Sequence, residues 1–149
     1  MLELESIQQK GFHNLYNEDG EAIGFQVCFR IVNYRSPWLS EFRFGNVTVD
    51  GERFGEDKCT FIIGGVEYTY AEMLTLGDVH WPLKEAVAVH VQKPGGLAQG
   101  SHTVSILYKT VSSYLPPRAD ELPAEAPEDA KVDRGHPEAR GYKREMLIV

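Results

Sequence analysis

Cysteine is scarce in this chain. The 149 residues include two cysteines, Cys28 and Cys59, which lie far apart in the sequence and form no CxxC motif. So few cysteines at this spacing give little support to a disulfide scaffold or a zinc knuckle. We therefore expect both to be reduced thiols in or near the core, where free cysteine is usually found.

Basic charge is also in short supply, which excludes two classes of partner. Lys and Arg total 15 against 22 Asp and Glu, so the formal net charge is −7. Nucleic acids and anionic membrane surfaces are bound by clustered basic side chains, and the sequence has no such cluster. We predict neither a nucleic-acid partner nor a membrane partner.

Long apolar runs are missing as well. Residues 1–12 have neither the basic start nor the apolar stretch of a signal peptide, and no later segment has the length of a transmembrane helix. These features predict a cytoplasmic protein. A hydrophobic content of 42% and a charged content of 25% predict a globular chain with one core.

What the sequence does contain is strand-like alternation of apolar and polar residues. Within residues 22–32, Phe25, Val27 and Phe29 alternate with polar or small residues, a pattern that predicts a half-buried strand. Residues 3–16 are expected to pair with it in a hairpin, because a turn-forming Asn-Glu-Asp-Gly sequence separates the two.

Further strands are predicted by the same alternation and by glycine-rich turns. Asp50-Gly51 and Gly64-Gly65 each have the residues that a two-residue hairpin turn requires. The alternation breaks phase at Gly45-Asn46, which predicts a β-bulge. Other predicted strands cover residues 42–49, 86–91 and 103–111, the last two facing each other across the connection 93–102.

Together these signals predict an all-β fold, an antiparallel β-sandwich or open barrel, over residues 1–117. One short helix is expected at 69–74, where Thr69 and Glu72 have capping-box spacing. Residues 118–149 form a Pro-rich extension with an apolar end. That end comprises Met146, Leu147, Ile148 and Val149. It is a returning strand, an anchor laid on another subunit or a frayed tail, and we favour the anchor.

The search for catalytic and metal-binding motifs is largely negative. The five histidines show no HxH, HxxH or HExxH spacing, and neither GxSxG nor GxGxxG occurs. His90 and His102 could meet across a hairpin and form a small cupin-like metal site with Glu67 or Asp78. A structural role for these histidines is favoured, so no catalytic, cofactor-binding or metal-binding residue is assigned.

Aromatic residues outside the alternating strands indicate a protein interface. Trp, Tyr and Arg are enriched at interface centres because they bury a large area and keep a polar group. We favour an interface for residues 34–38, and we weigh an interface evenly against core packing for Trp81. The interface candidates are Tyr34, Arg35, Trp38, Trp81, Met146, Leu147, Ile148 and Val149.

Several short motifs, in order, resemble the β subunit of bacterial C-glycoside deglycosidases. They cover residues 1–117: KGF at 10–12, YR at 34–35, VTVDGERF at 47–54, GGVEYT at 64–69, Trp81, KPGGL at 93–97 and YLP at 114–116. Each motif is common by itself, whereas the ordered set is fairly specific.

The resemblance implies a small subunit of a lyase that acts on 3-oxo-C-glucosides of aromatic aglycones. In that family the large α subunit is a TIM barrel similar to sugar-phosphate isomerases, and it holds a divalent metal such as manganese together with the catalytic acid and base. The C3 carbonyl acidifies the C2 hydrogen, so an enolate can form and expel the aglycone by elimination. The resemblance therefore implies a higher-order hetero-oligomer, with no cofactor in this chain.

Two other functions remain open at this point. A carbohydrate-binding or scaffold module would use the same sandwich with exposed aromatic platforms and would bind sugar as an isolated chain. A small cupin-like metalloenzyme would hold a metal in the isolated chain.

Overall fold

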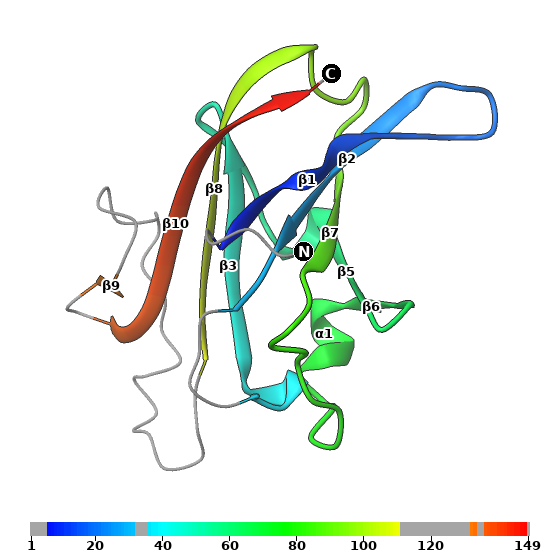
Figure 1. The fold of residues 1–149 in the computed structure, drawn as a ribbon. Helices are drawn as coiled ribbons and strands as arrows, with labels where there is room; N and C mark the ends of the chain where they lie inside the picture. Colours follow the sequence, from blue (N-terminus) through cyan, green and yellow to red (C-terminus); the bar gives the residue numbers. More distant parts are fainter. Residues whose placement is uncertain (1–5, 32–35, 111–131, 134–135, 149) are drawn as a thin grey trace.

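Two antiparallel sheets packed face to face form the protein (Figure 1). The computed structural model describes residues 6–31, 36–110, 132–133 and 136–148. The first sheet has the strand order β1 (Ile7–Tyr16), β2 (Ala22–Phe29), β7 (Val87–Gln92), β5 (Cys59–Ile63) and β6 (Val66–Thr69). The second has the order β4 (Glu52–Phe54), β3 (Phe42–Val49), β8 (Gly100–Thr110), β10 (His136–Ile148) and β9 (Val132–Asp133). The predicted all-β sandwich is confirmed.

Three predicted hairpins and their turns are also confirmed. Strands β1 and β2 pair in an antiparallel hairpin, and β3 with β4 and β5 with β6 are each joined by a two-residue turn. Asp50 and Gly51 have φ values of 51° and 88°, the left-handed conformation that such a turn demands. The bulge in β3 lies between Phe44 and Asn46.

The short helix and its cap match the sequence as well. Helix α1 (Tyr70–Met73) begins after Thr69, whose hydroxyl accepts a hydrogen bond from the backbone N–H of Glu72 at 3.2 Å. The carboxylate of Glu72 in turn accepts from the backbone N–H of Thr69 at 3.0 Å, completing the capping box. Two 3-10 turns, η1 (Leu39–Glu41) and η2 (Glu56–Lys58), precede β3 and β5. No helix in the described part of the chain is long and apolar enough to cross a membrane.

One strand pairing was predicted wrongly. Strands β7 and β8 do not form a hairpin, because β7 pairs with β2 and β5 whereas β8 pairs with β3 and β10. The connection between them carries the chain from one sheet to the other. Its backbone is held against β2, since Lys93 N donates to Ile23 O at 3.0 Å and Gly95 N donates to Ala22 O at 2.9 Å.

The core consists of the inward-facing residues of both sheets and is rich in aromatic rings. Phe42 of β3 stacks on Trp81 with ring centroids 4.4 Å apart, and Phe29 of β2 lies 5.6 Å from Trp81. All three side chains are fully buried. Aromatic contacts of this kind add specific geometry to the burial of a large apolar area.

The apolar C-terminus is a returning strand, which corrects the anchor that the sequence favoured. Strand β10 pairs with β8 continuously from Ala139 to Ile148. Met146 and Ile148 point into the core, with exposed fractions of 1% and 6%, while Leu147 is 54% exposed. The strand joins the sandwich because its alternation fits the one-sided burial of this sheet. Val149 and most of the Pro-rich stretch lie outside the described residues.

In the returning strand, Met146 is buried and Leu147 is exposed, so substitutions at the two positions should differ in their effect on stability. We expect Met146→Ala to destabilise the isolated chain by about 2–5 kcal/mol, since it leaves a cavity between the sheets. Leu147→Ala is the matched control and should change the free energy of unfolding by less than about 0.5 kcal/mol. Urea unfolding measures both, and equal small effects would contradict the assignment of this strand to the core.

Candidate functional site

An exposed aromatic stack lies on the two loops that precede β3 and β7. The indole of Trp38 stacks on the imidazole of His80, with ring centroids 3.7 Å apart and planes inclined by 21°. Trp38 is 36% exposed, and His80 is exposed too. We call this pair the Trp38–His80 stack.

Backbone hydrogen bonds hold the stack in place. Leu39 N donates to Val79 O at 2.8 Å, and Trp81 N donates to Pro37 O at 2.7 Å. Nδ1 of His80 lies 3.1 Å from the carbonyl oxygen of Ser36. Because a carbonyl oxygen can only accept a hydrogen bond, Nδ1 carries a proton and donates it to this contact. A large aromatic side chain held this rigidly has the properties of an interface hot spot. Tyr34 and Arg35, the other candidates in this segment, lie outside the described residues.

Of the two roles considered for Trp81, protein interface and core packing, the structure shows core packing. Its side chain has no exposed area and packs between Phe29 and Phe42. Along the loop, the exposed His80 and the buried Trp81 point to opposite sides, so the same short segment supplies both the core and the stack. The indole Nε1 of Trp81 is buried without a hydrogen-bond acceptor among the described residues.

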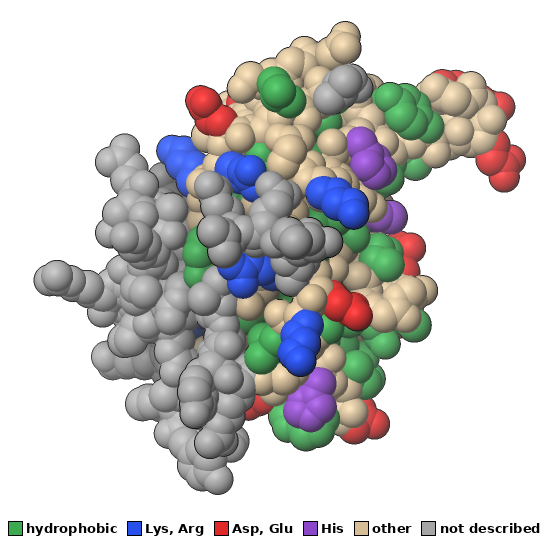
Figure 2. All heavy atoms as spheres, in the orientation of Figure 1, with side chains coloured by type: hydrophobic (Ala, Val, Ile, Leu, Met, Phe, Trp, Pro, Cys, Tyr) green, Lys and Arg blue, Asp and Glu red, His purple; other side chains and the backbone are tan. Residues whose placement is uncertain are grey.

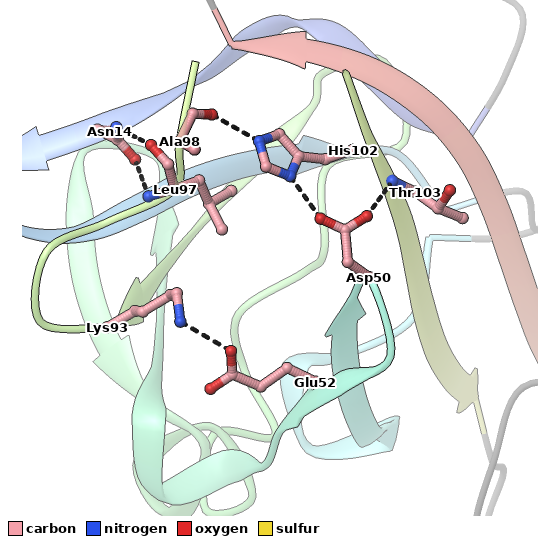
Figure 3. A network of polar contacts seen from close by, with 8 residues as sticks. All are labelled: Asn14, Asp50, Glu52, Lys93, Leu97, Ala98, His102 and Thr103. Atoms are coloured by element: carbon pink, nitrogen blue, oxygen red, sulfur yellow. Dashed lines mark hydrogen bonds and ion pairs between the residues drawn. The ribbon is translucent and has the colours of Figure 1, made fainter. Parts of the chain in front are cut away.

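A polar network around His102 joins the β3–β4 turn to the start of β8 (Figure 3). Nδ1 of His102 lies 2.6 Å from Oδ2 of Asp50, and Nε2 lies 2.6 Å from the carbonyl oxygen of Ala98. The second carboxylate oxygen of Asp50 accepts from the backbone N–H of Thr103 at 2.8 Å. Because both ring nitrogens face oxygen acceptors, the contacts are satisfied fully only by the doubly protonated, charged imidazolium.

The pKa shifts of this pair agree with that geometry. Burial lowers the pKa of His102, but its bonds to Ala98 and Asp50 outweigh burial and raise the pKa above its ordinary value. The bond from His102 and the one from the backbone of Thr103 lower the pKa of the Asp50 carboxyl. The pair therefore joins the β3–β4 turn to β8 within the second sheet, and the bond to Ala98 lets His102 hold the end of the β7–β8 connection as well.

Two further contacts in Figure 3 hold the connection between β7 and β8. The side-chain amide of Asn14 donates to Leu97 O and accepts from Leu97 N, both at 2.8 Å, so it pairs with Leu97 as a neighbouring strand would. Lys93 Nζ forms an ion pair with Glu52 at 2.7 Å. The connection is thus fixed at both of its ends.

A chain of three polar side chains crosses the outer face of the first sheet. Nε2 of His90 lies 2.9 Å from Oε1 of Gln26, and Nε2 of Gln26 lies 3.3 Å from Nε2 of His13. The amide nitrogen of Gln26 also donates to Gly11 O at 2.9 Å, which fixes the orientation of the amide. Burial lowers the pKa of His90, while Glu67 raises it and His13 lowers it further.

The proposed meeting of His90 and His102 does not occur. They lie on β7 and β8, in opposite sheets, and each bonds to a different set of partners. No group of three or more His, Cys, Asp or Glu side chains that could hold a metal ion is found among the described residues. The donors that the structure brings together therefore do not fit the cupin-like site, with Glu67 or Asp78, that the sequence left open.

The cysteines are also unsuited to nucleophilic chemistry. Both are free, Cys59 buried and Cys28 half-buried. Burial raises the pKa of Cys28, and burial together with the nearby Asp57 raises the pKa of Cys59 to about 12. Because the thiolate is the reactive form, neither side chain is an activated nucleophile near neutral pH.

The sequence did not predict the polar contacts of Asn14, Gln26 and Asp50 that fix this geometry. Asp50 was recognised only as a turn residue, and Asn14 and Gln26 were not singled out. Asn14 bonds to Leu97, Gln26 to His90 and Asp50 to His102, and these partners are 52 to 83 residues apart along the chain. No local motif marks a contact between such distant residues.

Comparison with known proteins identifies the family. Residues 2–114 match the family model described as C-glycoside deglycosidase beta subunit. The chain belongs to this family. A relative from Eubacterium cellulosolvens, named C-glycoside deglycosidase beta subunit, is 40% identical over 116 residues, which cover 78% of this chain and 79% of the relative. The family match includes strands β1 to β8 and ends before β10.

The Asp50–His102 pair should make the free energy of unfolding of this β-subunit family member depend on pH. His102 has a raised pKa in the folded state, so its stabilisation is complete below its unfolded pKa of 6.5 and is lost as the pH rises through the folded pKa. Asp50 has a lowered pKa, so its stabilisation is present above its unfolded pKa of 3.8 and is lost as the pH falls through the folded pKa. Both contributions are complete between these two unfolded values.

Urea unfolding of the wild type and of His102→Gln at pH 5.5 and pH 8.5 measures this dependence. We expect the stability difference between the two proteins to be larger at pH 5.5. Asp50→Asn keeps an acceptor for Thr103 but removes the charge, and in that background the His102→Gln effect should vary much less with pH. A difference that stays constant with pH would contradict a charged pair.

Proposed function

We propose that this chain is the non-catalytic small subunit of an enzyme that cleaves the C–C bond between sugar and aromatic aglycone in 3-oxo-C-glucosides. Its family membership supports a role in C-glycoside deglycosidation. The observation that carries the non-catalytic role is the commitment of its polar groups to the fold. His102 uses both ring nitrogens in structural contacts, and His90 and His13 are linked through Gln26.

Elimination of the aglycone requires a base to remove the C2 proton and a group to stabilise the enolate oxygen. The described residues bring together no metal-ligand set, and the pKa values of both cysteines are raised. These features favour a division of labour in which the chemistry belongs to the partner. We assign the divalent metal, manganese by family resemblance, and the catalytic residues to a TIM-barrel α subunit that resembles sugar-phosphate isomerases.

The name of the relative, a beta subunit, implies a heteromeric complex, and we extend that assembly to this chain. The Trp38–His80 stack is our candidate for one contact with the α subunit. Trp38 is flanked by Pro37 and Leu39, both buried, so its ring is presented from a segment anchored in the core. Such preorganisation lowers the conformational entropy lost on binding.

Reconstitution tests the proposed function. We expect aglycone release from a 3-oxo-C-glucoside only when the purified chain is combined with the α subunit, and metal analysis should find no stoichiometric divalent metal in the chain alone. Turnover by the isolated chain with bound metal would overturn the proposal. Saturable binding of the free sugar to the isolated chain, with no association with the α subunit, would favour a carbohydrate-binding module instead.

Trp38→Ala tests the contact made by the stack. We expect it to weaken association with the α subunit by about 1–3 kcal/mol, as truncation of an interface hot spot does. Val66→Ala, on the exposed side of the edge strand β6, is the control and should leave association unchanged. Calorimetric titration measures both, with thermal unfolding as the check that each variant folds. If Trp38→Ala associates as strongly as the wild type, Trp38 does not contact the α subunit.

A further inference from the structure

The β1–β2 hairpin extends well beyond the rest of the sandwich (Figure 1). Strand β2 pairs with β7 no further toward the turn than Gly24, and beyond it the β7–β8 connection, in the described part of the chain, bonds to β2 only at Ile23 and Ala22. Residues 16–21 are all exposed. We call residues 16–23 the arm.

The arm carries exposed apolar side chains. Tyr16 is 62% exposed and Ile23 is 49% exposed, which places both among the most exposed large apolar residues described. Ile23 also lines an open pocket of about 560 Å³, together with Phe54, Pro94 and several charged side chains. Single exposed apolar residues are common, but Tyr16 and Ile23 lie on one projecting hairpin.

The tip of the arm is acidic. Glu18, Asp19 and Glu21 lie within four consecutive positions, and Figure 2 shows acidic side chains at the end of the arm. No ion pair among the described residues involves any of the three carboxylates. The uncompensated charge and the apolar flank together would complement a surface that is apolar at its centre and basic at its rim.

Hydrogen bonds hold the arm at its tip and at its base. The side chain of Asn17 accepts hydrogen bonds from Asp19 N at 3.0 Å and from Glu21 N at 2.9 Å. Gly20 closes the turn with a φ of 80°. At its base, the arm is fastened to the β7–β8 connection by the contacts of Asn14 with Leu97. A segment held in one conformation loses little entropy when it binds.

An isolated two-stranded hairpin is marginally stable in water, so a projecting arm with apolar side chains gains most when another surface covers it. We propose that the arm docks on the α subunit, on an apolar surface with a basic rim. This inference rests on the proposed function, because it takes the α subunit as the occupant. It adds a contact made by residues 16–23, separate in sequence from the loops of the Trp38–His80 stack.

Matched variants separate the arm from the general effects of charge and hydrophobicity. Tyr16→Thr combined with Ile23→Thr removes the apolar surface and leaves a residue with high strand propensity at both positions. Val66→Thr is the apolar control, since Val66 is also 49% exposed and lies on an edge strand. Glu18→Lys with Asp19→Lys reverses the tip charge, and Glu56→Lys with Asp57→Lys makes the same change in net charge at the exposed turn η2.

Association with the purified α subunit is measured by surface plasmon resonance at low and high salt. We expect the Tyr16 and Ile23 double variant to bind at least about tenfold more weakly than the wild type, with Val66→Thr unchanged. The charge reversal at the tip should slow association at low salt about tenfold more than the η2 control, and the difference should shrink at high salt. Thermal unfolding confirms that each variant is folded. Because the tip carboxylates make no ion pair with described residues, the charge reversal tests the proposal even if the Tyr16 and Ile23 variant fails to fold.

The outcomes separate the arm from the proposed function. If the wild type does not bind the α subunit, both the proposed function and the arm's role in it are overturned. If the wild type binds and the arm variants bind equally well, the arm proposal alone is overturned. Sedimentation of the free chain gives the remaining outcome. A dimer that the arm variants dissociate, with α-subunit binding retained, would make a second copy the occupant and would also overturn the proposal.

Discussion

The burial of one aromatic cluster between the two sheets is the interaction on which the rest of the structure depends. Phe42 lies at its centre, 4.4 Å from Trp81 and 5.7 Å from both Phe61 and Tyr108. These rings come from both sheets and from a loop, so they fix the sheets relative to each other. Because buried rings interdigitate at close-packed density, the loops that supply them are held as firmly as the strands. The exposed Trp38 owes its fixed position to this arrangement.

Side chains that pair with backbone groups close the sides of the sandwich. Gln9 donates to and accepts from Leu147, each at 3.0 Å, just as Asn14 does with Leu97. Each amide mimics one residue of a neighbouring strand at a place where a true strand pair is missing. Unpaired backbone groups at a sheet edge invite association with another chain, and these contacts satisfy such groups at Leu97 and Leu147.

The chemistry of the described residues fits a subunit that positions and binds better than one that reacts. Titratable groups are available, yet Asp50 and His102 bond to each other within the second sheet, and the thiol of Cys59 is buried. A polar group with all its hydrogen bonds satisfied contributes to the fold and has no free site for substrate. This distribution of polar groups supports the division of labour proposed for the two subunits.

Local patterns in the sequence determined the strands up to β8, the two-residue turns, the β3 bulge and the capped helix α1. Each of these depends on neighbouring residues alone, through side-chain alternation or through glycine at positive φ. The family was also recognisable from short motifs such as VTVDGERF, and the comparisons confirmed it. The charge of −7 and the sparse cysteines likewise required no coordinates for their interpretation.

The tertiary structure alone decided which strands share a sheet, and with them the partners of the polar side chains. Alternation gives β7 and β8 an apolar face each, but the same face can pack within a hairpin or across a sandwich, and here they lie in opposite sheets. For the same reason the sequence favoured an anchor at the apolar C-terminus, whereas the structure places it as strand β10 beside β8. Trp81 became a core residue because it packs between Phe29 of one sheet and Phe42 of the other, and Asp50 met His102 because β3 pairs with β8 in the second sheet. Contacts between residues this far apart are set by the whole packing arrangement, which no local pattern contains.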